Sequence, residues 1–159
     1  MRPAPAVAWA GLALLPLALL GCGSRAATPV PPGSLDAASE ARLEKAADRV
    51  LGAIDAHDDA ALAAASVEIG KDGSVRRLAA ADVREMGEAL HAKYGQRATR
   101  KKAHAGEAPP FPAAAAWPVL VWFGEDEDLL KLWFVEESGE LLLARISEED
   151  PSVHADRAK

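Results

Sequence analysis

Apolar residues recur every three or four positions in two stretches of the chain, which is the spacing of one face of an α-helix. The pattern predicts helices over residues 34–57 and 80–94, the second ended by Gly95. An aspartate at position 58 or 59 is expected to cap a short helix that ends near residue 65. The two apolar stripes consist of Leu43, Ala47, Val50 and Ile54, and of Val83, Met86, Leu90 and Tyr94.

After Gly95 the apolar spacing becomes that of β-strands. Three strands are predicted over residues 119–123, 129–136 and 140–146, joined by an acidic turn and by a Ser-Gly turn. A polar, basic stretch over residues 96–105 is expected to form an edge strand. Residues 67–76, with a turn in the middle, suggest a small hairpin. Helices followed by antiparallel strands predict an α+β fold, with N-terminal helices packed on a sheet of about three to five strands.

Both faces of the predicted sheet are apolar, whereas a sheet with one solvated side alternates apolar and polar residues. One face carries Val119, Val121 and Phe123 with their cross-strand neighbours. We considered two covers for the other face. The chain itself covers it, through the proline-rich segment and Trp117, or a ligand or protein partner docks there. The residues of this possible interaction face are Trp122, Lys131, Trp133 and Val135.

The predicted edge strand holds a cluster of basic residues in an acidic protein. They form a possible basic surface for anionic headgroups or an acidic partner. The alternative is that they keep an edge strand from pairing with other chains. The cluster consists of Arg97, Arg100, Lys101 and Lys102, followed by His104.

The N-terminal segment has the pattern of an export signal. Arg2 precedes an apolar run over residues 6–20, which is shorter than the roughly 20 apolar residues of a membrane-spanning helix. The run ends in Leu19-Leu20-Gly21-Cys22 and resembles the signal peptide and lipobox of bacterial lipoproteins, although Leu20 is larger than the residue usual there. This resemblance implies cleavage between Gly21 and Cys22 and a lipid anchor, with palmitate, on Cys22. The alternative is an ordinary signal peptide with an incidental cysteine.

The predicted organisation is a signal peptide over residues 1–21, a lipidated cysteine and flexible linker over 22–33, one domain over 34–148, and a polar tail over 149–159. Prolines in the linker favour extended conformations. Cys22 is the only cysteine, so a disulfide within the chain is excluded. The net charge of -6 argues against a nucleic-acid partner.

The run Ala-Ile-Asp-Ala-His-Asp-Asp-Ala-Ala-Leu over residues 53–62 resembles the helix-turn-helix opening of the nuclear transport factor 2-like superfamily. The third helix, ended by glycine, and the terminal antiparallel sheet extend this resemblance over residues 36–148. It implies a cone-shaped fold, with a curved sheet wrapped over helices. Members of the superfamily serve as enzymes, ligand-binding pockets and protein-protein modules, so the fold alone does not define a function.

Catalytic and metal-binding motifs are scarce. Glu88 and His91 have the Glu-x-x-His spacing of di-iron sites, but the sequence has no second copy. Gly-x-Ser-x-Gly, Walker and His-Glu-x-x-His motifs are absent from the sequence, and the acidic run 125–128 lacks the spacing of a calcium loop. We therefore expect no cofactor and no catalytic residue.

The sequence predicts a lipid-anchored protein of the bacterial cell envelope with a non-catalytic domain that binds a protein partner or a small apolar ligand. Gly23 follows Cys22 in place of the aspartate that retains some lipoproteins at the inner membrane, which favours the outer membrane and the periplasmic side. The alternative is an enzyme that uses a cone cavity for proton transfer, with Asp55 or Tyr94 as the acid-base group.

Overall fold

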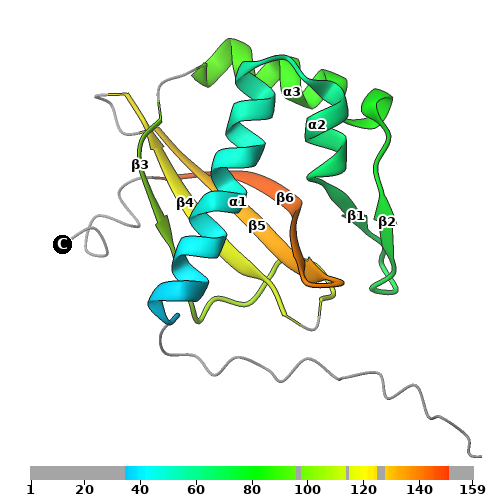
Figure 1. Ribbon diagram of the computed structural model, residues 1–159, viewed down its shortest axis with the longest axis vertical. Coiled ribbons are helices and arrows are strands. Elements are labelled where there is room, and N and C mark those ends of the chain that lie inside the picture. Colours follow the sequence, from blue (N-terminus) through cyan, green and yellow to red (C-terminus); the bar gives the residue numbers. More distant parts are fainter. Residues whose placement is uncertain (1–34, 96–97, 114, 125–127, 151–159) are drawn as a thin grey trace, which may run out of the picture.

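The computed structural model describes residues 35–95, 98–113, 115–124 and 128–150 (Figure 1). The predicted signal peptide, its cleavage site at Gly21 and Cys22, the linker, Arg97 and nearly all of the C-terminal tail lie outside these residues. None of the described helices is both long enough and apolar enough to cross a membrane.

Three helices come first in the domain: α1 (Ala37–Asp55), α2 (Asp59–Ala64) and α3 (Ala80–Tyr94). Asp36 caps α1 by accepting a hydrogen bond from the Ser39 N–H, so this helix begins slightly later than the sequence predicted. Asp58 caps α2 in the same way, through the Ala61 N–H at 2.9 Å. The α1 residues that face inward are Leu43, Ala46, Ala47, Val50, Ala53 and Ile54, which confirms the predicted stripe.

The strands form one four-stranded antiparallel sheet and a separate hairpin. The sheet has the order β3 (Ala98–Ala103), β4 (Trp117–Phe123), β5 (Asp128–Glu137) and β6 (Glu140–Glu149). The hairpin pairs β1 (Val67–Ile69) with β2 (Val75–Arg77). These elements confirm the predicted α+β fold, in which N-terminal helices pack on an antiparallel sheet.

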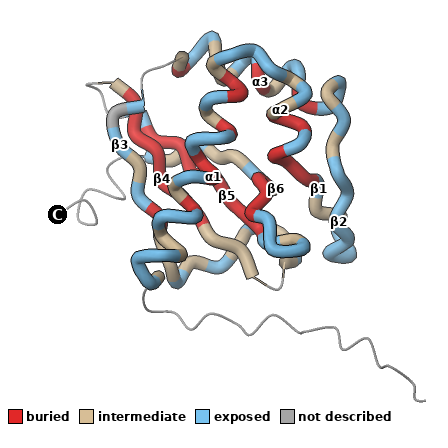
Figure 2. The backbone as a smooth tube through the Cα atoms, viewed as in Figure 1, coloured by how far each residue is buried: buried red, intermediate tan, exposed pale blue. Residues whose placement is uncertain are grey.

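The register of the sheet confirms which residues share a face. Val119 pairs with Leu132, and Val121 pairs with Leu130. All four side chains belong to the core cluster that also contains the inward stripe of α1. Figure 1 shows α1 crossing this face of the sheet, and Figure 2 shows the buried residues concentrated along β4, β5 and the inner side of α1.

β6 contains an irregularity that bends the strand. Leu143 pairs with Phe134, and Arg145 pairs with Trp133, so Ala144 is the extra residue of a bulge. The first half of β6 also contacts the end of α2, because the Leu143 N–H donates to the Ala65 carbonyl at 2.8 Å. The hairpin of β1 and β2 is thereby held at the edge of the sheet, beside β6.

Candidate functional site

The interaction face predicted from the sequence is buried inside the domain. Trp122 and Trp133 are 4% and 2% exposed, and Val135 is 5% exposed. The segment between β3 and β4 covers part of this face, since the edge of the Phe111 ring lies against Trp133 with centroids 6.1 Å apart. The guanidinium of Arg100 lies over the Trp122 ring, 4.1 Å from its centroid. In this structure the chain itself therefore covers the two tryptophans.

Lys131, the polar member of this face, is also buried. Its ammonium pairs with Glu107 Oε1 at 2.7 Å and with Glu149 Oε2 at 3.2 Å. Glu107 belongs to the covering segment, and Glu149 is the last residue of β6. A buried charge needs such partners, so this face contains a buried ion-pair centre.

The basic residues of β3 do not form one surface. The register places Arg100 opposite Trp122 and Lys101 opposite Val121, so they project from opposite faces of the sheet. Lys101 forms an ion pair with Asp48 of α1. β3 is the edge of the four-stranded sheet, where lysine and arginine discourage pairing with other chains.

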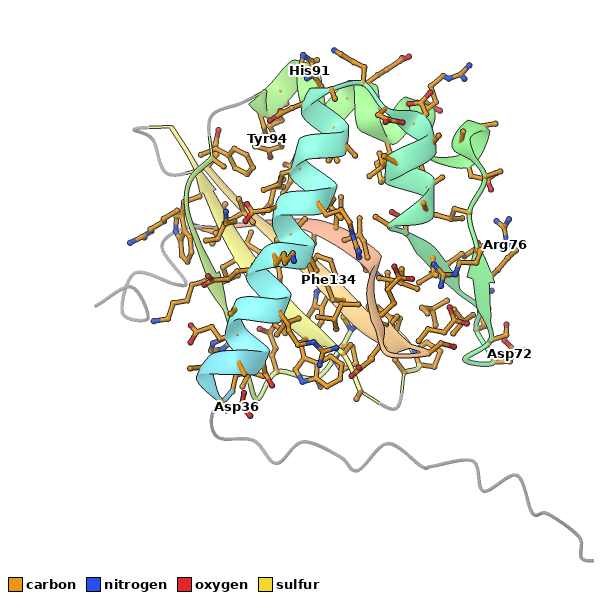
Figure 3. The ribbon with its side chains drawn as sticks, in the orientation of Figure 1. Asp36, Asp72, Arg76, His91, Tyr94 and Phe134 are labelled. Carbon is orange, nitrogen blue, oxygen red and sulfur yellow. The ribbon has the colours of Figure 1, made fainter. Side chains whose placement is uncertain are left out.

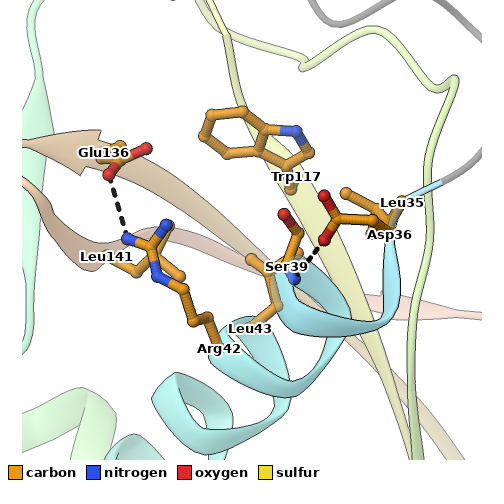
Figure 4. A pocket seen from close by; sticks show the side chains of 8 residues that line it. All are labelled: Leu35, Asp36, Ser39, Arg42, Leu43, Trp117, Glu136 and Leu141. Carbon is orange, nitrogen blue, oxygen red and sulfur yellow. Dashed lines mark hydrogen bonds and ion pairs between the residues drawn. The ribbon is translucent and has the colours of Figure 1, made fainter.

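A pocket lies at the opposite end of the domain from α3, where α1 starts. Its volume is about 270 Å³. The first two turns of α1, the start of β4, the end of β5 and the start of β6 build its walls (Figure 4). We call it the Trp117 pocket, and its lining consists of Leu35, Asp36, Ser39, Arg42, Leu43, Trp117, Glu136 and Leu141.

The Trp117 pocket has an apolar base and a charged rim. Leu43 and Leu141 are buried, while Trp117 is half-buried and packs against the main core. At the rim, an Arg42 nitrogen lies 3.0 Å from Glu136 Oε1 and donates also to the Gly139 carbonyl at 3.3 Å. Such a combination suits an apolar group held by a few oriented polar groups.

Asp36 brings a fixed negative charge to the rim. The Ser39 N–H donates to Asp36 Oδ1 at 2.7 Å, and this bond lowers the pKa of the carboxyl below its ordinary value. Asp36 is therefore ionised at neutral pH, and it also compensates the partial positive charge at the start of α1.

Sequence reasoning placed Trp117 on the wrong face of the sheet. One of the two predicted covers had Trp117 lie over Trp122 and Trp133, whereas it pairs with Phe134 and lies on the α1 side. Strand alternation contained the signal, because Trp117 lies two residues before Val119 and so shares its face. Extending the predicted strand to residue 117 would have found this residue.

Tyr94, a candidate acid-base group, is packed in the interior at the end of α3 (Figure 3). It is 5% exposed, and its ring lies 4.6 Å from that of Phe123. Burial raises the pKa of Tyr94, and hydrogen bonds with Lys93 and Glu148 modify the shift. Asp55, the other candidate, ends α1.

His91 contacts another histidine. Its ring lies 3.9 Å from the ring of His57, which belongs to the turn between α1 and α2. Within the described residues, no cluster of three or more His, Cys, Asp or Glu side chains is arranged to hold a metal ion.

Comparison with known proteins bears on the fold alone. Among solved structures, the chain is similar to a protein of unknown function with a cystatin-like fold from Nostoc punctiforme PCC 73102, at 17% identity and a TM-score of 0.41, over 76% of this chain and 97% of that one. It is also similar to Aln2 from a Streptomyces species, at 12% identity and a TM-score of 0.37, over 75% of this chain and 94% of that one. No protein-family model and no curated protein sequence matches the chain.

Proposed function

We propose that the protein is a lipoprotein of the bacterial cell envelope whose domain binds a small apolar ligand, without catalysis, in the Trp117 pocket. The observation that carries this proposal is the pocket itself, in which Leu43, Leu141 and the Trp117 ring lie beneath a charged rim. Apolar lining with a few polar groups is what ligand binding requires. A protein partner that inserts one apolar side chain is the other occupant to be tested.

The position of the pocket fits an anchored protein. Leu35 and Asp36, which line it, are the first described residues, and the proposed linker runs from them back to Cys22. A linker over residues 22–33 spans roughly 40 Å at most. The proposed anchor therefore holds the pocket near an outer-membrane surface, where apolar molecules are concentrated.

The enzyme hypothesis has weaker support. A proton-transfer site needs a titratable group within hydrogen-bond reach of a bound substrate. The space between α1 and the sheet is filled by side chains such as Val50, Leu132 and Phe134, each fully buried. Tyr94 belongs to the same core cluster, and its ring packs against that of Phe123.

The test uses an octyl probe with a photoactivatable diazirine, applied to intact cells that make the full-length protein. We expect the probe to label peptides that contain the pocket residues. Ser39→Trp fills the pocket, yet it keeps the backbone N–H that bonds to Asp36. We expect it to reduce pocket labelling by about tenfold or more.

The matched control is Ala41→Trp, which adds the same side chain at an exposed position of α1 outside the pocket lining. It should label like the unmodified protein. Equal labelling in both variants, or labelling confined to other peptides, would contradict ligand binding in the pocket. Capture of a protein through the pocket, with no effect of the octyl probe, would favour the protein partner instead.

A further inference from the structure

His57 occupies a backbone position that glycine usually fills. It follows the C-cap of α1 and has a φ of 51°, in the left-handed region. Its N–H donates to the Ile54 carbonyl at 3.2 Å, and the Asp58 N–H donates to the Ala53 carbonyl at 2.9 Å. These two bonds form a Schellman motif, in which a residue with a Cβ atom is strained. The local backbone therefore favours glycine, although histidine adopts this conformation more often than most other residues.

The imidazole of His57 meets a second imidazole. The rings of His57 and His91 have centroids 3.9 Å apart and planes inclined by 50°. The two residues come from separate elements: His57 lies in the turn after α1, and His91 lies in the last full turn of α3, where Figure 3 labels it. The fold thus brings together two side chains that are 34 positions apart in the sequence.

One ring nitrogen of this pair is left without a partner. His91 Nδ1 is shut off from solvent and makes no hydrogen bond. Buried polar atoms are nearly always satisfied, so an orphaned one indicates a missing partner, which is a water molecule or an ion. Three separate observations concern the contact between His57 and His91. They are the left-handed backbone of His57, the contact of the two rings, and the unpaired Nδ1 of His91.

We propose that His57 and His91 bind a divalent late transition-metal ion of the Cu²⁺ or Zn²⁺ class. Neutral imidazole is a preferred ligand of these ions. With metal–nitrogen bonds of about 2.0–2.1 Å, two nitrogens on one ion lie about 3 Å apart. The two rings are in contact at 3.9 Å, so binding requires side-chain rotations that separate them slightly and turn one nitrogen of each toward the same point. An ion between them also gives His91 Nδ1 its missing partner.

Among the residues that the structure describes, only two ligands are available to the proposed site, so we expect its ion to be exchangeable. The described residues supply no third His, Cys, Asp or Glu to it, so water completes the coordination shell. Two imidazoles without a closed shell are expected to release the ion to a chelator. This site lies away from the Trp117 pocket, and the proposal does not depend on ligand binding there.

The test compares thermal unfolding of the full-length protein with and without added metal. The protein carries no polyhistidine tag, is extracted in detergent, and is first stripped of metal with a chelator. Cu²⁺, or Zn²⁺ in a parallel series, at about 100 times its dissociation constant is expected to raise the melting temperature by at least about 5 °C. With Cu²⁺, electron paramagnetic resonance should show coupling to imidazole nitrogen.

His57→Gly separates the proposal from a purely structural role of the ring contact. We expect it to raise the melting temperature without metal, because glycine relieves the left-handed strain, and to abolish the shift produced by metal. His57→Asn, which also tolerates this conformation, and His91→Gln should likewise lose the metal shift. His104→Asn, a control outside the pair, should keep it. The proposal is overturned if the unmodified protein shows no shift, or if His57→Gly retains it.

Discussion

The ammonium of Lys131 lies in the middle of an apolar sheet face, opposite Leu120 on one neighbouring strand and Ser147 on the other. It is 4% exposed and pairs with Glu107 and Glu149. A buried ion pair adds little stability by itself, but removing one partner leaves uncompensated charge. Lys131 therefore joins the covering segment to the end of β6.

We expect Lys131→Met to lower the free energy of unfolding by about 2 to 3 kcal/mol, measured by urea denaturation. The value lies below the roughly 3 to 5 kcal/mol typical of fully buried pairs, because the two glutamates are partly exposed. The double variant Lys131→Met with Glu107→Leu should recover part of the loss, since it removes one orphaned carboxylate. If Lys131→Met is as stable as the unmodified protein, the ion-pair centre does not hold the segment.

For single residues, the sequence predicts which face of the sheet a side chain lies on better than it predicts which residue that side chain contacts. Alternation along the strands placed Trp122, Lys131 and Trp133 on one face correctly. It did not predict that Glu107 pairs with Lys131, because Glu107 lies in an irregular segment that has no periodicity. The Trp117 pocket was missed for a related reason. Arg42 and Gly139, whose hydrogen bond joins α1 to the β5–β6 turn at its rim, are 97 residues apart.

The elements themselves follow closely from local patterns. Stripes at helical spacing predicted α1 and α3, and the alternating runs predicted β4, β5 and β6. β4 begins two residues before its predicted start, where Trp117 continues the alternation of the strand. β6 extends three residues beyond its predicted end, where the charged Glu149 still pairs with β5. Long-range pairing, which local patterns do not encode, fixes the end of β6.

The turn between β5 and β6 allows a prediction at the scale of an element. Ser138 and Gly139 both have positive φ, at 53° and 84°, which is the pattern of a type I′ hairpin turn. Asparagine tolerates the first position better than serine. We expect Ser138→Asn to raise the free energy of unfolding by up to about 1 kcal/mol.

Gly139→Ala is the matched change in the opposite direction. It places a Cβ atom in the left-handed region, where the surrounding space is open but the backbone is strained. It should therefore destabilise the protein in the same denaturation experiment. A stabilised Gly139→Ala, or a destabilised Ser138→Asn, would show that the turn adopts another conformation.

The whole molecule combines a domain that covers most of its own sheet with the N-terminal export signal that its sequence predicts. The helices cover one face, and the segment between β3 and β4 covers part of the other. The sheet face that carries Trp122 and Trp133 is buried. The proposed function is therefore tested at the Trp117 pocket and at the proposed lipid anchor. The anchor is a prediction of the sequence alone, and its chemistry is specific enough for a direct test.

We expect the full-length protein to incorporate labelled palmitate and to sediment with the outer membrane, whereas Cys22→Ala should incorporate no label. One acyl chain holds a protein only marginally, while two or more hold it stably, so the lipid-modified form should resist extraction with high salt. Gly23→Asp provides the control for sorting, since it should keep the palmitate and move the protein toward the inner membrane in a density gradient. Label retained in Cys22→Ala would assign the modification to another residue, and unlabelled wild-type protein would leave an ordinary export signal as the explanation of the first 22 residues.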